Sequence, residues 1–224
     1  MKADLKKTLV SSAVTGALMV GTAGFSTAKA ELEFNVGAYT DYILWGTSAS
    51  ENNAVVQGGI DYGHESGFYA GTWISTLGDS NGDLPGQEVD LYFGYEFGYG
   101  DVGFDIGYVY YYYTALDDAD YGDIVGTVSY GPVYATVQYA LNAQNSDFEG
   151  STVFKFGGEY EIMPSISLGA EIGTVNLEPD STDWVFWSLG LTKSTDMGDI
   201  SVTYAQTDES DLDPLFVVGY SISF

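Results

Sequence analysis

The chain has 224 residues, a formal net charge of −26 and no cysteine. The lack of cysteine excludes a disulfide framework and a cysteine-based metal site. The large excess of carboxylates disfavours nucleic acid and anionic substrates as partners, and it attracts cations.

The composition favours an all-β protein. Aromatic residues make up 16% of the chain, there are 29 glycines, and long helical periods are rare. Residues of these types are enriched in strands and turns. The same aromatic content excludes a disordered acidic chain. No segment of the mature chain has the run of about 18 apolar residues that a membrane-spanning helix needs.

The N-terminus has the pattern of a secretory signal peptide. A basic start is followed by an apolar stretch over residues 9–25 and by the small residues Ala28 and Ala30. This order is typical of a cleaved signal. We therefore expect residues 1–30 to be removed and residues 31–224 to form one domain. Asp4 and four lysines leave with the signal, so 31 carboxylates remain against Lys155 and Lys193, a net charge of −29.

Apolar and polar residues alternate in twelve segments of the expected mature chain. The segments are about nine to thirteen residues long, as tilted strands that cross a bilayer must be, whereas strands of soluble proteins average about five or six residues. We place them at residues 31–40, 53–63, 67–76, 87–98, 101–113, 123–131, 132–142, 151–161, 165–175, 184–194, 199–207 and 215–224. Segment 184–194 is ambiguous, because both of its faces begin with apolar residues.

The connections alternate in length. The five short ones are near residues 64–66, 98–100, 131–132, 162–164 and 195–198, and the six long ones are at 41–52, 77–86, 114–122, 143–150, 176–183 and 208–214. This alternation predicts a transmembrane antiparallel up-and-down β-barrel of about twelve strands, with short periplasmic turns and long outer loops. An even strand number places both termini on the periplasmic side of the outer membrane.

The last segment resembles the C-terminal signal of bacterial outer-membrane barrels. Every second residue is apolar or aromatic, the segment ends on an aromatic, and a glycine lies five residues before that end; the signal comprises Phe216, Val218, Gly219, Tyr220, Ile222 and Phe224. We expect the barrel-assembly machinery to recognise this strand, and we expect the strand to close the barrel against residues 31–40. The apolar row would face lipid and lipopolysaccharide.

Aromatic residues gather near the expected strand ends. They are Tyr39, Tyr42, Trp45, the run Tyr110–Tyr113, Trp184 and Trp187. Phenol and indole rings suit the boundary between lipid and water, which predicts an aromatic girdle. The alternative is that these are ordinary strand-forming aromatics.

Several stretches resemble the TorF-like (Gcw_chp) family of proposed outer-membrane porins. They are Asp41-Tyr42 with Gly46 and Ser48, then residues 54–62, 66–73 and 88–95; the similarity is densest over 35–111. The resemblance implies an outer-membrane barrel with a porin-like role, and it supplies no catalytic residue. The family pattern usually has an arginine before the glycine of its first motif, where this chain has Trp45.

The sequence argues against an enzyme and against a cofactor. A serine hydrolase needs a base within reach of its nucleophile. His64 is the only histidine, and it falls in an expected periplasmic turn. The surrounding Gly63–Gly67 only partly matches a nucleophile elbow, because its serine is one position late and no helix follows.

The long loops are rich in carboxylates. Asp79–Asp83 imitates the start of an EF-hand loop, but Leu84 replaces the required glycine and Asp90 the final glutamate, so we expect no specific metal site there. The other loop carboxylates are Asp117, Asp118, Asp120, Glu178, Asp180, Asp183, Asp208, Glu209, Asp211 and Asp213. We hypothesise that this set binds divalent cations weakly. The alternative is a solvated loop surface that resists aggregation.

A second set of charges alternates with the apolar residues of the strands, and would line the lumen of a barrel. It comprises Glu33, Asp61, Glu88, Asp90, Glu96, Asp105, Lys155, Glu159 and Glu171. Rings of carboxylates select cations. The sequence therefore predicts a porin-like monomer for passive diffusion of small cationic or neutral solutes. The alternative is a non-conducting barrel that acts in envelope structure or interaction through its acidic, cation-binding loops.

Overall fold

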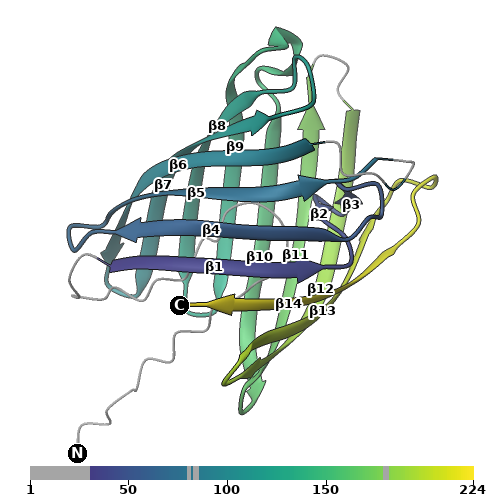
Figure 1. Cartoon of the computed structure of the whole chain (residues 1–224). Helices are drawn as coiled ribbons and strands as arrows, with labels where there is room; N and C mark the ends of the chain where they lie inside the picture. Colours follow the sequence, from purple (N-terminus) through teal and green to yellow (C-terminus); the bar gives the residue numbers. More distant parts are fainter. Residues whose placement is uncertain (1–30, 80–81, 83–85, 179–181) are drawn as a thin grey trace, which may run out of the picture.

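The computed structural model describes residues 31–79, 82, 86–178 and 182–224, and Figure 1 shows its arrangement. The elements in chain order are β1 (Glu31–Tyr39), β2 (Ile43–Leu44), β3 (Thr47–Ser48), β4 (Val55–Gly63), β5 (Phe68–Leu77), β6 (Gly86–Tyr99), β7 (Val102–Tyr113), β8 (Tyr121–Tyr130), β9 (Val133–Ala143), η1 (Ser146–Phe148), β10 (Thr152–Met163), β11 (Ile166–Leu177), β12 (Thr182–Thr195), β13 (Gly198–Thr207) and β14 (Leu215–Ser223). The expected signal peptide lies outside the described residues.

Twelve of these strands form one closed antiparallel barrel. Each strand pairs with its neighbour in the chain from β4 to β14, and β1 closes the ring between β4 and β14. The prediction of a twelve-stranded up-and-down barrel is confirmed. Strands of the near and far walls cross at a large angle in Figure 1, which follows from the tilt that closure requires. The two remaining strands, β2 and β3, form a small separate hairpin.

Closure uses the first and last strands of the barrel, β1 and β14, as expected. The backbone groups of Phe34 and Phe224 exchange two hydrogen bonds, of 3.0 and 2.9 Å, and their rings stack with centroids 5.9 Å apart. Further along the seam, Tyr39 pairs with Gly219. A closed ring leaves no strand edge for lipid to meet, so each of its twelve strands has hydrogen-bonded neighbours on both sides.

The exterior of the barrel is apolar on all twelve strands. Examples are Leu32 on β1, Phe156 on β10 and Phe216 on β14, which are 55%, 56% and 72% exposed. A hydrophobic belt of this extent is not stable against water, and it is the surface that lipid requires. The fold is therefore that of a membrane-spanning barrel. The helical segments within the described residues include none that is long and apolar enough to cross a bilayer.

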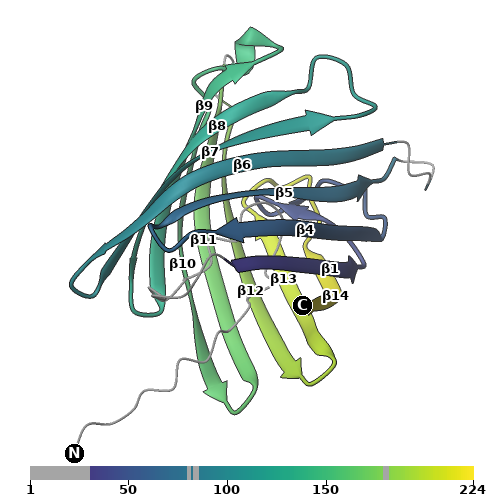
Figure 2. The ribbon, with the colours of Figure 1, turned by 60° about the vertical axis from the view of Figure 1, so that its left-hand side comes forward.

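The two rims of the barrel differ, as the sequence predicted. Short turns gather along one rim, here named the short-turn end, and long loops gather along the other, the long-loop end (Figure 2). β1 starts and β14 ends at the short-turn end. Four of the five short turns use a glycine with positive φ, at Gly67, Gly100, Gly131 and Gly198, and Ser165 has φ 63° in the fifth. Positive φ costs little only for glycine, so most of these tight turns depend on it.

Candidate functional site

The inner wall carries every charged residue that the sequence assigned to the lumen. Side chains at these positions alternate with the exposed apolar row of the same strand. Six carboxylates lie in the half near the short-turn end, and we name them the carboxylate ring: Glu33 (β1), Asp61 (β4), Glu96 (β6), Asp105 (β7), Glu159 (β10) and Glu171 (β11). Glu88 and Asp90 lie near the long-loop end of β6.

The carboxylate ring is built from three pairs on neighbouring strands. Glu33 stands directly opposite Asp61, and Glu96 stands directly opposite Asp105. Like charges in opposed positions of an antiparallel pair repel each other. The lumen therefore has two sites of opposed carboxylates at which a cation would relieve repulsion. The third pair is formed by Glu159 and Glu171, described below.

A tyrosine from a nearby strand covers one carboxylate of each pair. In the first case, the ring of Tyr92 on β6 lies across Gly71 on β5 and its hydroxyl donates to Asp61 on β4. A Cβ atom on Gly71 would lie 2.5 Å from the ring. Glycine is therefore required here, because it lets the ring lie flat against the wall. Asn35 Nδ2 donates to the same carboxylate at 3.3 Å.

The same arrangement recurs on β9, β10 and β11. Tyr134 is in register with Gly157, which is in register with Glu171, and the phenol donates to Glu171 Oε2 at 2.6 Å. A Cβ on Gly157 would lie 2.7 Å from the tyrosine oxygen. Glu159 approaches Gly169 of the adjacent strand and completes this third pair. We call this arrangement the tyrosine–glycine–carboxylate unit.

A third unit is shifted by one step along the strands. Tyr69 on β5 lies over Gly94 on β6 and Gly107 on β7, and hydrogen-bonds Asp105 on β7. Sequence reasoning missed all three tyrosines. The available signal was a glycine in the inward row beside a tyrosine of the next strand, but it requires the register to be known. Three of the six carboxylates in the ring, Asp61, Asp105 and Glu171, are thus each held by a tyrosine hydroxyl.

Lys155 on β10 is the one basic residue on the inner wall of the described chain. Lys193 belongs to the outward row of β12 and is exposed. Its neighbours in register are Thr136 and Gly173. Thr136 bonds Thr127 at 2.9 Å. One ammonium among so many carboxylates leaves the lumen strongly negative.

The long-loop half contains a second group, the buried acidic cluster of Glu88, Asp90 and Asp123. Their side chains are 2%, 2% and 3% exposed. Glu88 accepts a hydrogen bond from Tyr42 at 3.2 Å. Within the described residues, Asp90 Oδ1 and Asp123 Oδ1 have no hydrogen-bond partner. Sequence reasoning missed Asp123, because the inner row of β8 also carries Val125 and therefore does not look polar.

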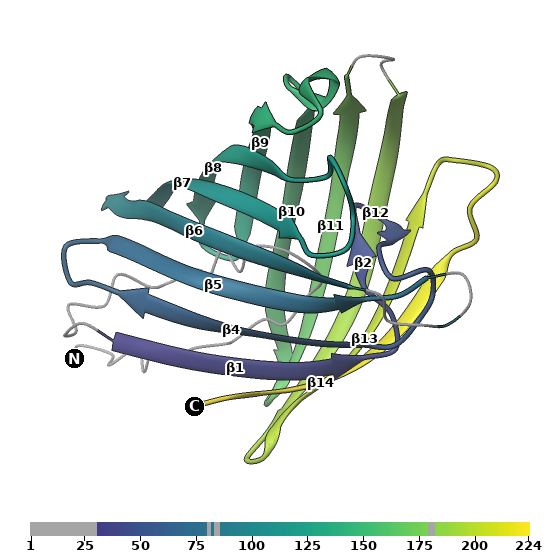
Figure 3. The ribbon, with the colours of Figure 1, turned by 45° about the horizontal axis from the view of Figure 1, so that its top comes forward.

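Residues 41–52, the first long connection, fold into the mouth of the barrel; we name them the inward loop (Figure 3). Consecutive residues reach different parts of the inner wall. Tyr42 packs with Val55 and Leu77, and Ile43 packs with Ala205, Leu215 and Val217. The loop therefore crosses the lumen at its long-loop end.

Hydrogen bonds and a sharp turn hold the inward loop in place. Asp41 is buried and accepts from Tyr42 N at 2.7 Å and from Ser48 Oγ at 2.6 Å. Trp184 Nε1 donates to the carbonyl oxygen of Trp45 at 3.0 Å. Gly46 has φ 81°, and a Cβ there would lie 2.6 Å from Phe186 Cβ. Only glycine fits at this contact with the wall.

This placement corrects part of the predicted aromatic girdle. Tyr42 is 1% exposed inside the barrel, and Trp45 packs on the inner-wall cluster of Val153, Val175 and Phe186 with Trp184. Burial, and then Glu88 and Asp90, raise the pKa of the Tyr42 phenol, which keeps it a neutral donor. The rings are inside because the loop folds inward over an apolar part of the wall.

The strand aromatics divide between the two faces. Tyr111 is 2% exposed and Tyr113 packs against the same inner cluster, whereas Tyr112 is 46% exposed outside. On β12, Trp184 and Phe186 are inside, and Leu189 and Leu191 are outside, with Trp187 on that same outward row. The two apolar faces of this segment are therefore both used, one by lipid and one by the inward loop.

Most loop carboxylates are exposed and do not form one site. Asp117, Asp118, Glu178, Asp183, Asp208, Glu209, Asp211 and Asp213 are exposed, and Asp180 lies outside the described residues. Asp120 instead is 5% exposed, and accepts from Tyr113 N at 2.9 Å and Gln144 Nε2 at 3.0 Å. It fixes two loops together. Across the described part of the chain, no three histidine or carboxylate side chains form a group that could hold a metal.

His64 lies in the β4–β5 turn and is exposed. Its Nδ1 is 2.8 Å from Ser66 Oγ, two residues along the same turn. The contact orders the turn, at the end of the barrel away from the inward loop. The Asp79–Asp83 stretch falls largely outside the described residues.

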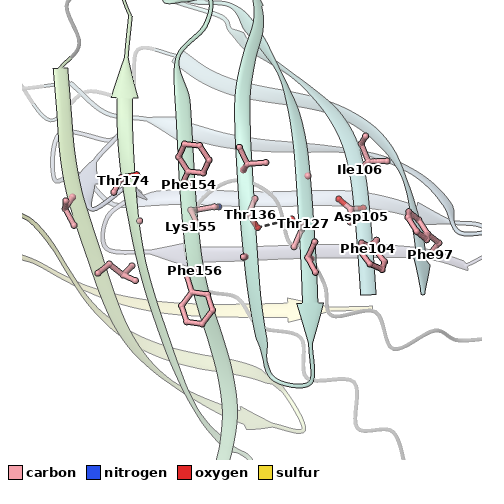
Figure 4. Close-up of a pocket in the computed structure, with 17 residues that line it drawn as sticks. Phe97, Phe104, Asp105, Ile106, Thr127, Thr136, Phe154, Lys155, Phe156 and Thr174 are labelled. Carbon is pink, nitrogen blue, oxygen red and sulfur yellow. Dashed lines mark hydrogen bonds between the residues drawn. The ribbon is translucent and has the colours of Figure 1, made fainter. Parts of the chain in front are cut away.

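The outer wall has a depression of about 820 Å³ across β6 to β12 (Figure 4). Phe104, Phe154 and Phe156 stand around it, and the small residues Gly126 and Ala135 leave room between them. Most of its lining belongs to the outward row of each strand. It is therefore mainly part of the surface that faces lipid, and inner-wall residues such as Asp105 and Lys155 also line it.

The chain belongs to a family described as bacterial protein of unknown function (Gcw_chp), whose pattern matches residues 23–217. This confirms the predicted family, although its description does not include the TorF-like name. No curated protein matches the chain.

Among solved structures, a KdgM porin aligns with a TM-score of 0.60 at 6% identity, covering 86% of this chain and 98% of the porin. A KdgM porin in complex with disordered oligogalacturonate aligns with a TM-score of 0.55 at 6% identity, covering 86% and 97%. At these identities, the likeness is one of fold.

Proposed function

We propose that the protein is an outer-membrane porin-like channel for passive diffusion of small cationic or neutral solutes. The observation that carries the proposal is the carboxylate ring: three pairs on the inner wall, opposed by the single ammonium of Lys155. Carboxylates around a water-filled path raise the local concentration of cations and exclude anions. The channel needs no cofactor and performs no catalysis.

The likeness of fold to the KdgM porin supports a channel, and the negative charge of the inner wall supports a preference for cations over anions. Oligogalacturonate, named for the solved KdgM complex, is an acidic oligosaccharide. The carboxylate ring would repel such a polyanion. The chain therefore offers the barrel architecture of a porin with a lumen suited to the opposite charge.

The proposal includes the location of the protein in the cell. A cleaved signal over residues 1–30 would export the chain, and the terminal strand from Phe216 to Phe224 would guide assembly by the barrel machinery. The apolar exterior would meet outer-membrane lipid and lipopolysaccharide. Both termini would then face the periplasm, the long loops the outside, and one barrel would act as a monomer.

Planar-bilayer recording tests the proposal. Under a salt gradient, the wild-type reversal potential should have the sign of cation preference. The triple variant Glu96→Gln/Asp105→Asn/Glu171→Gln should move it toward zero. A matched control, Glu209→Gln/Asp211→Asn/Asp213→Asn, removes the same charge from an exposed loop and should change it little. Anion preference in the wild type, or equal shifts in both variants, contradicts the proposal.

One observation favours a second candidate, a non-conducting envelope barrel with acidic, cation-binding loops. The inward loop closes the long-loop end through contacts with three parts of the wall. Recording from a variant in which residues 43–48 are replaced by a short glycine–serine linker separates the two. A channel conducts before the change and more after it, whereas a structural barrel conducts only after it.

A further inference from the structure

Two aromatic side chains lie on the inner wall where the carboxylate ring approaches the inward loop. Tyr92 on β6 lies across Gly71, and Trp73 on β5 reaches Gly59 on β4, where a Cβ would lie 3.5 Å from Trp73 Cδ1. Because Gly71 has no side chain to hold the ring away, the Tyr92 ring turns one face to the wall and the other to the lumen. Both aromatic side chains are half-buried, so part of each remains accessible.

A pair of carboxylates stands beside these two aromatic side chains. Asp61 is in register with Gly71, the residue beneath the Tyr92 ring, and with Glu33 on β1. Trp73 is two positions from Gly71 in the same inner row. Residues offset by two positions on neighbouring strands are about 7–8 Å apart, which is within reach of an aromatic side chain. The rings and the carboxylates come from β1, β4, β5 and β6, which are consecutive around the barrel, and they border one part of the lumen.

The protein already supplies hydrogen-bond donors to Asp61. The Tyr92 hydroxyl donates to Oδ1, and Asn35 Nδ2 donates to Oδ2 at 3.3 Å. The negative charge is not balanced in the same way. Glu33 lies within electrostatic range of Asp61, and Lys155 is on β10, the strand farthest from β4 around the ring. A ligand of this site therefore needs a positive charge but no N–H group.

We infer that this part of the wall, here named the aromatic cation site, binds the quaternary ammonium group of a small organic cation. The site comprises Glu33, Asp61, Trp73 and Tyr92. Indole and phenol faces attract cations, and quaternary ammonium is the class of cation that aromatic sites typically recognise. No three carboxylate or histidine side chains of the described chain converge as a metal site requires. The inference rests on the proposed passage of cations through the lumen and names the class of cation.

The aromatic cation site lies between the inward loop and a second tyrosine. On the long-loop side, Tyr42 of the inward loop packs against Trp73, with ring centroids 5.6 Å apart. On the short-turn side, Tyr69 lies over Gly94 and hydrogen-bonds Asp105. This neighbouring unit also combines a tyrosine with a pair of carboxylates, but Trp73 is not beside it. The indole therefore distinguishes the two units, and the second one supplies a matched control.

The test is a calorimetric titration of the refolded full barrel with tetramethylammonium at constant ionic strength, in a maltoside detergent, which carries no ammonium group. Methylammonium has the same charge but keeps N–H groups, and tert-butanol is a neutral molecule with a similar methyl surface. We expect saturable binding of tetramethylammonium, with methylammonium and tert-butanol at least about fivefold weaker. Trp73→Leu should weaken tetramethylammonium about fivefold through loss of the indole face. Asp61→Asn should weaken it about tenfold through loss of one charge.

Asp105→Asn is the matched control for the charge, and Trp187→Leu on the outward row is the control for the indole. Each should leave tetramethylammonium binding within about twofold. Absence of saturable binding overturns the inference, as does equal binding of methylammonium or tert-butanol, or an equal loss in the controls. If Trp73→Leu does not assemble, Asp61→Asn, which keeps an acceptor for the Tyr92 hydroxyl, carries the test. Conductance is measured separately, so a cation-selective channel that does not bind tetramethylammonium overturns this inference alone.

Discussion

The two halves of the lumen solve the problem of internal carboxylates in different ways. In the short-turn half, each pair of the carboxylate ring has a tyrosine donor and partial exposure. In the long-loop half, the buried acidic cluster lies under the inward loop. Buried carboxylate oxygens without a partner among the described residues occur in both halves, Asp105 Oδ2 in the first and Asp90 Oδ1 and Asp123 Oδ1 in the second. The first half provides a phenol donor for one carboxylate of each pair. The second buries its carboxylates beneath the inward loop and beside an aromatic cluster.

The difference follows from what covers the carboxylate ring and the buried acidic cluster. Glycines in the inward rows leave the short-turn half open enough for flat tyrosine rings. The long-loop half is filled by four apolar clusters that include residues of the inward loop in three cases. The carboxylate ring of the short-turn half and the inward loop at the long-loop end can therefore be altered independently. Variants that change one half of the lumen at a time separate their contributions, and they follow in order of expected effect.

Removing the anchor of the inward loop should have the largest effect. Trp45 packs on Val153, Val175 and Phe186 and forms a tilted ring contact with Trp184. Trp45→Ala should lower the free energy of unfolding by about 3 kcal/mol, at the lower end for a large aromatic because the ring is only partly buried. Urea titration of the barrel in lipid vesicles measures this. The single-channel conductance should rise in the same variant; an unchanged conductance would mean the loop does not restrict the mouth.

A methyl group added to a glycine that a tyrosine ring covers should destabilise the short-turn half. Gly71→Ala places a Cβ 2.5 Å from the Tyr92 ring and should cost about 2 kcal/mol of unfolding free energy by overpacking. Gly63→Ala is the control, because a Cβ there meets nothing within 4 Å. Adding Tyr92→Ala removes the clash. If the double variant loses as much unfolding free energy as the two single variants together, the Tyr92 ring does not depend on Gly71 for its position.

Neutralising the buried acidic cluster should stabilise the barrel. Asp90→Asn/Asp123→Asn removes two charges from a buried site that provides no donors for Asp90 Oδ1 or Asp123 Oδ1 among the described residues. The free energy of unfolding should rise by about 1.5 kcal/mol. The corresponding change in the other half, Glu171→Gln, keeps the bond from Tyr134 and should have little effect. Destabilisation by the double variant would show that the cluster is already satisfied.

The outer surface of the barrel was predictable from sequence, and the inner surface only in part. Lipid requires an apolar residue at every second outward position, so rows such as Val89, Leu91 and Phe93 define a strand without knowledge of its neighbours. The inner wall has no such uniform rule. Val125 beside Asp123 interrupts the polar pattern, which is why that carboxylate was missed.

Contacts between strands were beyond the reach of the sequence for a related reason. Tyr92 and Asp61 are 31 residues apart and meet only because Gly71 stands between them in register. The inward loop poses the same difficulty. Its residues 41–52 have no strand period, and whether such a loop folds out into water or in over an apolar wall depends on the finished barrel.

The smallest effect should come from a single hydroxyl of the carboxylate ring. Tyr134→Phe removes the 2.6 Å bond to Glu171 but keeps the ring on Gly157. The loss should be about 1 kcal/mol in urea titration, because a partly exposed carboxylate recovers water in place of the phenol. Cation preference in planar bilayers should persist, since the charge of Glu171 remains. A reversal potential that falls to zero would mean that the position of the carboxylate, rather than its charge, sets selectivity.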